Sequence, residues 1–154
     1  MGLFSKPNSK SAQADISEKV NQIISNWQGW VNAFVEAEFE GKKYSLSQLN
    51  EAIAFLVTEA ASLNDEVLLQ WTSKACVAIK SSTTDIAPVD SMAQVMFDVS
   101  SFSITLRKKY SGKTKYEEAI TLLGLAALKT LEQHPNYTEI LEYMRLNANK
   151  LAGN

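Results

Sequence analysis

The chain has 154 residues, of which 45% are apolar, and a formal net charge of −2. This length suits one domain, and the apolar content is too high for a disordered chain. The near-neutral charge favours neither a nucleic-acid-binding protein nor an acidic tail, and the low content of 6 glycines and 3 prolines disfavours a turn-rich β-sandwich.

The N-terminal part is predicted to be a tail followed by a long helix. Residues 1–11 are rich in Ser, Lys and Asn and contain Pro7, so we expect a flexible tail ahead of a single helical domain over residues 12–154. Apolar residues recur every three or four positions from Ile16 to Phe34, which predicts a helix of about 25 residues that ends before Gly41. Alternating glutamates at its end oppose the helix dipole, so an extended segment over residues 38–44 is the alternative.

Two helices are predicted in the next forty or so residues. Ser45 and Gln48 form a capping box, which indicates a second helix that runs to Leu63. Asn64 or Asp65 is expected to cap a third helix, which ends near residue 80. Residues 81–87 are a loop by composition.

A fourth helix is predicted from Pro88, which suits a first helical turn, to Gly112, which ends it. One apolar line follows its length from Met92 to Tyr110. A second line contains Ala93, Phe97 and Ile104. We therefore expect this helix to be packed on two sides.

The segment over residues 119–131, AITLLGLAALKTL, is apolar all the way round a helix and too short to cross a bilayer. We interpret it as a central helix that opens with a capping box at Thr114 and Glu117, and Gly124 is expected to let neighbouring helices approach. A sixth helix is predicted over residues 138–151. The fold prediction is an all-α, single compact bundle of about six helices, mostly antiparallel, with a buried central helix near residues 115–133.

No residue pattern in the sequence predicts a catalytic, metal or cofactor site. Cys76 is the only cysteine and lies among apolar neighbours, so we expect a buried side chain, with a reactive thiol as the alternative. His134 is the only histidine and is expected at the surface of a helix end. One histidine and one cysteine are too few for a typical zinc or di-iron site.

Two further patterns have residue types suited to chemistry. The stretch from Ser111 to Thr114, SGKT, imitates the end of a phosphate-binding loop, but Arg107 stands where that loop needs a glycine, and a helix precedes it instead of a strand. Several carboxylates have the chemistry for acid–base work, but no pair is predicted to converge: Glu36, Glu38, Glu40, Glu51 and Glu59.

A run of basic residues is the strongest local charge feature. It consists of Arg107, Lys108, Lys109, Lys113 and Lys115. Cations at a helix C-terminus stabilise it by roughly 0.3–1 kcal/mol each, which explains part of the run without any partner. The functional interpretation is a patch for an acidic protein surface or for nucleic acid. Among the aromatic residues, Trp30 beside Gly29 and Phe55 on the far side of its helix are the candidates for partner contact.

These patterns predict a small, non-catalytic cytosolic protein that docks onto a larger protein as a subunit, adaptor or inhibitor. A nucleic-acid-associated subunit that uses residues 107–115 is the alternative, and an enzyme or sensor with an apolar pocket between helices is a weaker one. The single cysteine and the lack of a signal-peptide pattern favour the cytoplasm, no membrane contact is expected, and a homo-oligomer is compatible with the sequence.

Overall fold

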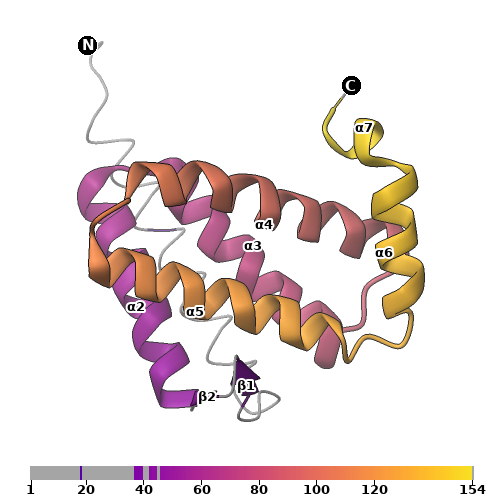
Figure 1. The fold of residues 1–154 in the computed structure, drawn as a ribbon, viewed down its shortest axis with the longest axis horizontal. Helices are drawn as coiled ribbons and strands as arrows, with labels where there is room; N and C mark the ends of the chain where they lie inside the picture. Colours follow the sequence, from indigo (N-terminus) through magenta and orange to yellow (C-terminus); the bar gives the residue numbers. More distant parts are fainter. Residues whose placement is uncertain (1–17, 19–36, 40–41, 45, 154) are drawn as a thin grey trace.

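The computed structural model describes residues 18, 37–39, 42–44 and 46–153 (Figure 1). Two short strands and six helices lie in this part of the chain: β1 (Ala37–Phe39), β2 (Lys42–Tyr44), α2 (Leu46–Leu63), α3 (Glu66–Thr83), α4 (Val89–Lys109), α5 (Thr114–Leu131), α6 (Tyr137–Leu146) and α7 (Ala148–Leu151). The predicted all-α bundle is confirmed. None of the helices in the described ranges is both long enough and apolar enough to span a membrane.

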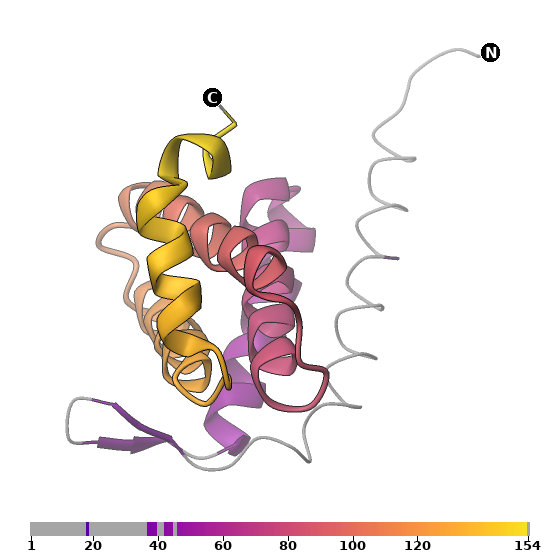
Figure 2. The same ribbon diagram turned by 90° about the vertical axis from the view of Figure 1, so that its right-hand side faces the viewer.

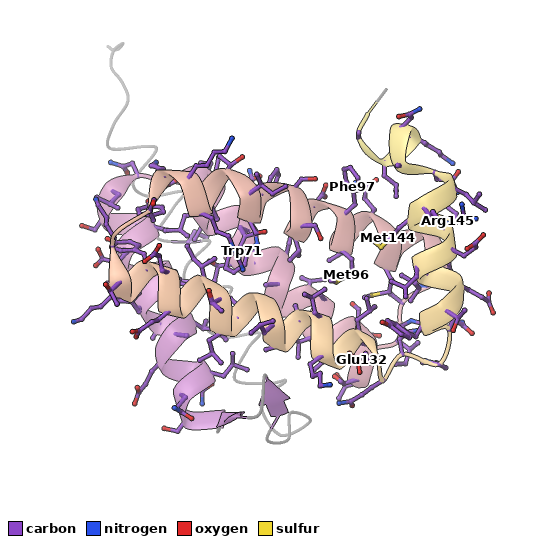
Figure 3. The ribbon with its side chains drawn as sticks, in the orientation of Figure 1. Trp71, Met96, Phe97, Glu132, Met144 and Arg145 are labelled. Atoms are coloured by element: carbon purple, nitrogen blue, oxygen red, sulfur yellow. The ribbon has the colours of Figure 1, made fainter. Side chains whose placement is uncertain are left out.

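The bundle is formed by α2, α3, α4 and α5, in which α3 and α5 each pack against the other three helices, while α6 lies across the start of α4 and the end of α5 (Figures 1 and 2). The most enclosed helix is α3, which contacts α2, α4 and α5. Its Trp71 is fully buried in the interior (Figure 3), and the indole Nε1–H donates a 2.9 Å hydrogen bond to the carbonyl oxygen of Val99. This bond satisfies the one polar atom of the largest core side chain.

The predicted central helix is α5, and it packs against α2, α3 and α4. Its inner face is buried, but Leu128 is 48% exposed, so residues 119–131 are not enclosed on every side. The all-round apolar pattern cannot distinguish a surrounded helix from one whose outer face keeps a few apolar residues in water, which is common at protein surfaces. The spacer role expected for Gly124 is also unsupported, since an added Cβ would only reach ordinary contact with Trp71.

The two apolar lines predicted for α4 differ in how deeply their side chains are buried. The long seam is buried at Met92, Val99, Leu106 and Tyr110. On the second line Ala93 is buried and Phe97 half-buried, but Ile104 is 62% exposed, so packing on two sides is wrong for this end of the helix.

Helix boundaries differ from the predictions in three places. The third helix, α3, extends to Thr83, so residues 81–83 are helical and the predicted loop begins only after them. The N-cap of α5 is Lys113, which makes no side-chain capping bond, and the Glu117 carboxylate instead accepts a 3.4 Å hydrogen bond from the Gly112 N–H. The positive φ of Gly112, 83°, sets the tight turn that shifts this start. The predicted sixth helix is divided at Asn147 into α6 and α7.

The N-terminal predictions fall mostly outside the described residues. This applies to the tail over residues 1–11 and to most of the predicted first helix, of which Glu18 is helical. Ala37–Phe39 is a strand that pairs antiparallel with Lys42–Tyr44, so the helical prediction is wrong there and the extended alternative is correct. The hairpin is an addition to the helical bundle.

Candidate functional site

The structure brings Phe55 next to the basic run. The ring of Phe55 meets the ring of Tyr116 edge-on, with centroids 5.1 Å apart, and Tyr116 stacks on Tyr110 at 4.4 Å with the ring planes 4° apart. Tyr110 lies in the middle of the basic run. Phe55 and the basic run, which are about 55 residues apart in the sequence, therefore lie close together in the structure. They adjoin the place where the α2–α3 turn meets the α4–α5 turn.

Two lysines of the basic run lie over the stacked tyrosines. The Nζ of Lys109 is 5.6 Å from the centroid of the Tyr110 ring. The Nζ of Lys113 is 5.8 Å from the Tyr110 centroid and 5.9 Å from that of Tyr116. Cation–π contacts at exposed sites contribute about 0.5–1 kcal/mol. These residues, Phe55, Tyr110, Tyr116, Lys109 and Lys113, form what we call the aromatic–basic end.

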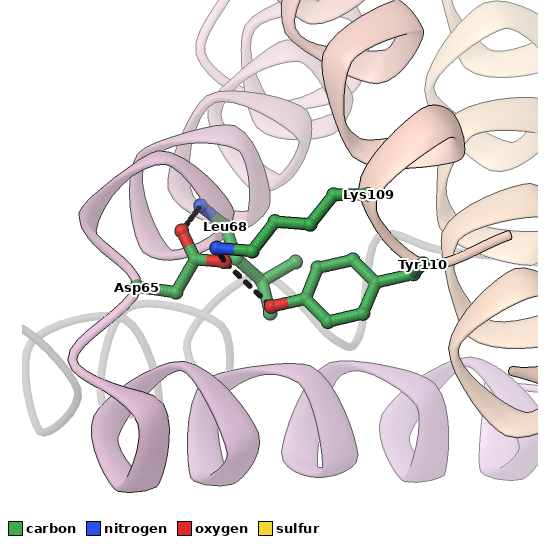
Figure 4. Close-up of polar contacts among 4 residues, drawn as sticks. All are labelled: Asp65, Leu68, Lys109 and Tyr110. Carbon is green, nitrogen blue, oxygen red and sulfur yellow. Dashed lines mark hydrogen bonds and ion pairs between the residues drawn. The ribbon is translucent and has the colours of Figure 1, made fainter.

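A buried carboxylate holds this end together (Figure 4). Asp65 is only 6% exposed and caps α3 by accepting a 3.1 Å hydrogen bond from the Leu68 N–H. Its Oδ2 accepts from the Lys109 ammonium at 2.7 Å and from the Tyr110 hydroxyl at 2.5 Å. The prediction that Asp65 or Asn64 caps this helix is confirmed for Asp65.

The electrostatics of this cluster favour a structural role. Burial raises the pKa of Asp65, but the hydrogen bonds from Lys109, Tyr110 and the Leu68 N–H outweigh it and hold that pKa below its ordinary value. Burial and the bond to Asp65 raise the pKa of Tyr110. General acid–base catalysis works best with a pKa near the operating pH. Both shifts lead away from neutrality, so this cluster is an ion pair that ties two turns together.

A second carboxylate supports the other tyrosine. Glu59 on α2 accepts a hydrogen bond from the Tyr116 hydroxyl, which raises the pKa of Tyr116. Glu59 is one of the carboxylates whose chemistry suits acid–base work, but in the structure it accepts a hydrogen bond from a tyrosine. Both tyrosines are thus oriented by carboxylates from the α2–α3 hairpin.

An open groove of about 640 Å³ lies beside this cluster, between α2 and α5. Its lining residues are Gln48, Glu51, Ala52, Phe55, Lys115, Glu117, Glu118, Ala119, Thr121 and Leu122. Ala52 and Ala119 are buried, and Phe55 and Leu122 are half-buried, so the floor is apolar while the rims are polar. We call this the α2–α5 groove.

The predicted contact residues that the structure describes divide into three groups. Phe55 and Lys115 line the α2–α5 groove, and Lys109 and Lys113 cover the tyrosines. Arg107 and Lys108 are exposed in the last turn of α4. Trp30 lies outside the described residues.

The prediction that the lone histidine, His134, lies at the surface is wrong, because its side chain is buried. His134 is 3% exposed, its Nε2–H donates to the carbonyl oxygen of Ala87 at 2.8 Å, and its Nδ1 accepts from the Asn136 N–H at 3.0 Å. It joins the α3–α4 loop to the α5–α6 turn. Cys76 is buried as expected, and burial raises its pKa to about 12.

Sequence reasoning missed the partners of the two tyrosines. Nothing in the sequence pairs Asp65 with Tyr110 or Glu59 with Tyr116, because contacts between distant turns leave no periodic pattern. The only available signal was Asp65 itself, as a helix cap.

Within the described ranges, no three His, Cys, Asp or Glu side chains are placed to hold a metal ion. Comparison of the chain with protein families, with curated proteins and with solved structures finds no match. Function therefore follows only from the residues themselves.

Proposed function

We propose that this chain is a non-catalytic cytosolic interaction protein, which docks onto a larger protein as a subunit, adaptor or inhibitor. The observation that carries the proposal is the position of Phe55, a half-buried aromatic ring that lines an open groove and adjoins the aromatic–basic end. Protein interfaces concentrate their binding energy in aromatic residues that enter or line such depressions, surrounded by polar groups.

Rigidity supports the same proposal. Phe55 packs against Tyr116, which is held by Tyr110 and by Glu59. A preorganised aromatic side chain loses little conformational entropy when a partner covers it. The surface is thus ready to bind without rearrangement.

The proposal is tested by capture of partners with the tagged full-length chain, followed by identification and stoichiometry of the captured proteins. We expect one stoichiometric protein partner, whose binding weakens by roughly tenfold or more in Phe55→Ala. Ile104→Ala is the matched control, because it removes an exposed apolar side chain of α4 that does not line the groove.

Thermal unfolding of both variants checks that the fold is intact, and Lys115→Glu, at an exposed rim position, tests the same surface without touching the core. A wild-type chain that stays monomeric and captures no stoichiometric partner contradicts the proposal.

Nucleic-acid binding through residues 107–115 is the alternative function, favoured by the exposure of Arg107, Lys108 and Lys113 on one end of the bundle. Lys109 contributes less, because Asp65 neutralises it. Arg107→Glu with Lys108→Glu is expected to abolish retention on nucleic acid if this alternative holds. The absence of retention of the wild type at about 50 mM salt excludes it.

A further inference from the structure

The rims of the α2–α5 groove carry opposite charge to the basic run beside it. Glu51 projects from α2, and Glu117 and Glu118 project from α5, against the single cation of Lys115. All four side chains are exposed. The groove is thus an acidic site with an apolar floor.

These charges are available to a ligand. In the part of the chain that the structure describes, Glu51, Glu118 and Lys115 make no ion pair or side-chain hydrogen bond, and Glu117 has only the 3.4 Å bond from the Gly112 N–H. Lys115 is three residues from Glu118 on α5 yet forms no ion pair with it. The negative charge of the rim carboxylates therefore remains available to attract a positively charged group in the groove.

The apolar floor of the groove is formed by one face of α2 and one face of α5. Ala52 and Phe55 are one helical turn apart on α2, and Ala119 and Leu122 are one turn apart on α5. The small side chains Ala52 and Ala119 leave room between the two larger ones. A third helix that lies on two such faces buries apolar residues at spacings of three and four, as in helix-in-groove recognition.

We propose that the α2–α5 groove receives a short amphipathic helix of the partner protein, whose apolar residues contact Phe55 and Leu122 and whose Lys or Arg residues face Glu51 and Glu118. This inference rests on the proposed function and specifies its partner. It reverses the expectation drawn from the basic run, which favoured an acidic partner surface, because the groove that holds Phe55 is acidic.

The test uses two labelled synthetic peptides of the same helical pattern, one with leucines flanked by lysines and one with the lysines replaced by glutamates. Titration of the full-length protein at about 50 mM salt, followed by fluorescence anisotropy, is expected to show at least about tenfold tighter binding of the basic peptide. Chemical-shift changes in the ¹⁵N spectrum are expected at residues 48–55 and 115–122. Equal binding of the two peptides, or shifts confined to other helices, overturns the inference.

Reversal of one rim charge tests whether the basic peptide binds in the groove. Glu118→Lys is expected to weaken binding of the basic peptide by roughly fivefold, while Glu139→Lys, the same change at an exposed position on α6, leaves it within about twofold. Equal loss in both variants indicates only non-specific attraction and overturns the inference. Glu118→Gln removes the charge without reversing it, and an intermediate loss is expected.

The natural partner separates the two proposals. If Phe55→Ala loses the captured partner and Glu118→Lys retains it at full affinity, the acidic groove is not the recognition element, and the proposed docking function still stands. If the wild type captures no partner, both are contradicted.

Discussion

The Tyr110 hydroxyl donates a 2.5 Å hydrogen bond to Oδ2 of Asp65, a residue 45 positions earlier in the chain. This bond joins the start of α3 to the end of α4. It is buried, and the same carboxylate also caps α3 through the Leu68 N–H. Asp65 therefore holds the Tyr110 part of the aromatic–basic end through a single side chain.

Asp65→Ala is expected to lower the free energy of unfolding by about 2–4 kcal/mol. The change removes an N-cap worth about 1 kcal/mol and leaves the buried Tyr110 hydroxyl without its acceptor, which costs about 1–3 kcal/mol. The exposed Lys109 adds at most about 1 kcal/mol. Urea unfolding measures the difference, and Asp65→Asn, which keeps a capping oxygen, should lose less. A loss under about 0.5 kcal/mol for Asp65→Ala contradicts this account.

Acidic pH should weaken the fold through Asp65. The pKa of Asp65 is lower in the folded state than its ordinary 3.8, so its contribution is fully present above that value and is lost as the pH falls through the folded pKa. We expect the free energy of unfolding to fall more steeply below about pH 4 in the wild type than in Asp65→Asn. Parallel acid profiles for the two proteins contradict the prediction.

Alkaline pH should weaken the fold through Tyr110, the hydrogen-bond partner of Asp65. Burial and the bond to Asp65 raise the pKa of Tyr110 above its ordinary 10.0 in the folded state. Its contribution is therefore fully present below pH 10 and is lost as the pH rises through the folded pKa. Tyr110→Phe should reduce this alkaline loss, as followed by far-ultraviolet circular dichroism, while the part that arises from the raised pKa of Tyr116 remains. Retention of the same alkaline loss in Tyr110→Phe assigns it to another group.

Gly124→Ala is expected to stabilise the protein by about 0.5–1 kcal/mol, because glycine is a poor residue inside a helix. The new methyl group would lie 3.6 Å from Cζ2 of Trp71, an ordinary contact distance. Melting temperature should rise by about 1–4 °C. Gly124→Leu, which extends further toward Trp71, is the opposite control and should destabilise by about 1–3 kcal/mol. A lower melting temperature for Gly124→Ala means that the neighbouring helix is closer than described.

Cys76 should be unreactive in the folded protein. Burial raises the pKa of its thiol to about 12, and the reactive species is the thiolate. Alkylation with iodoacetamide at neutral pH, followed by mass spectrometry, should be slow for the native chain and fast in denaturant. Rapid modification of the native chain contradicts the burial of this side chain.

The periodic part of the fold was predictable from the sequence. The helices from residue 46 onward follow the three-and-four spacing of apolar residues, and the caps and stops at Asp65 and Gly112 were recognised because their chemistry is local. Boundaries failed at Thr83, Lys113 and Asn147, where the path of the chain between packed helices decides the turn geometry.

The candidate site was only half predictable. The sequence by itself determined that this chain forms an all-α bundle and which residues have side chains suited to contact, such as Phe55 and Lys113. Only the tertiary structure decided that these residues share one end, that Asp65 and Glu59 hold the tyrosines, and that His134 is buried. The physical reason is that helical periodicity is a property of neighbouring residues, whereas a contact across 45 residues depends on how the turns meet when the core is packed.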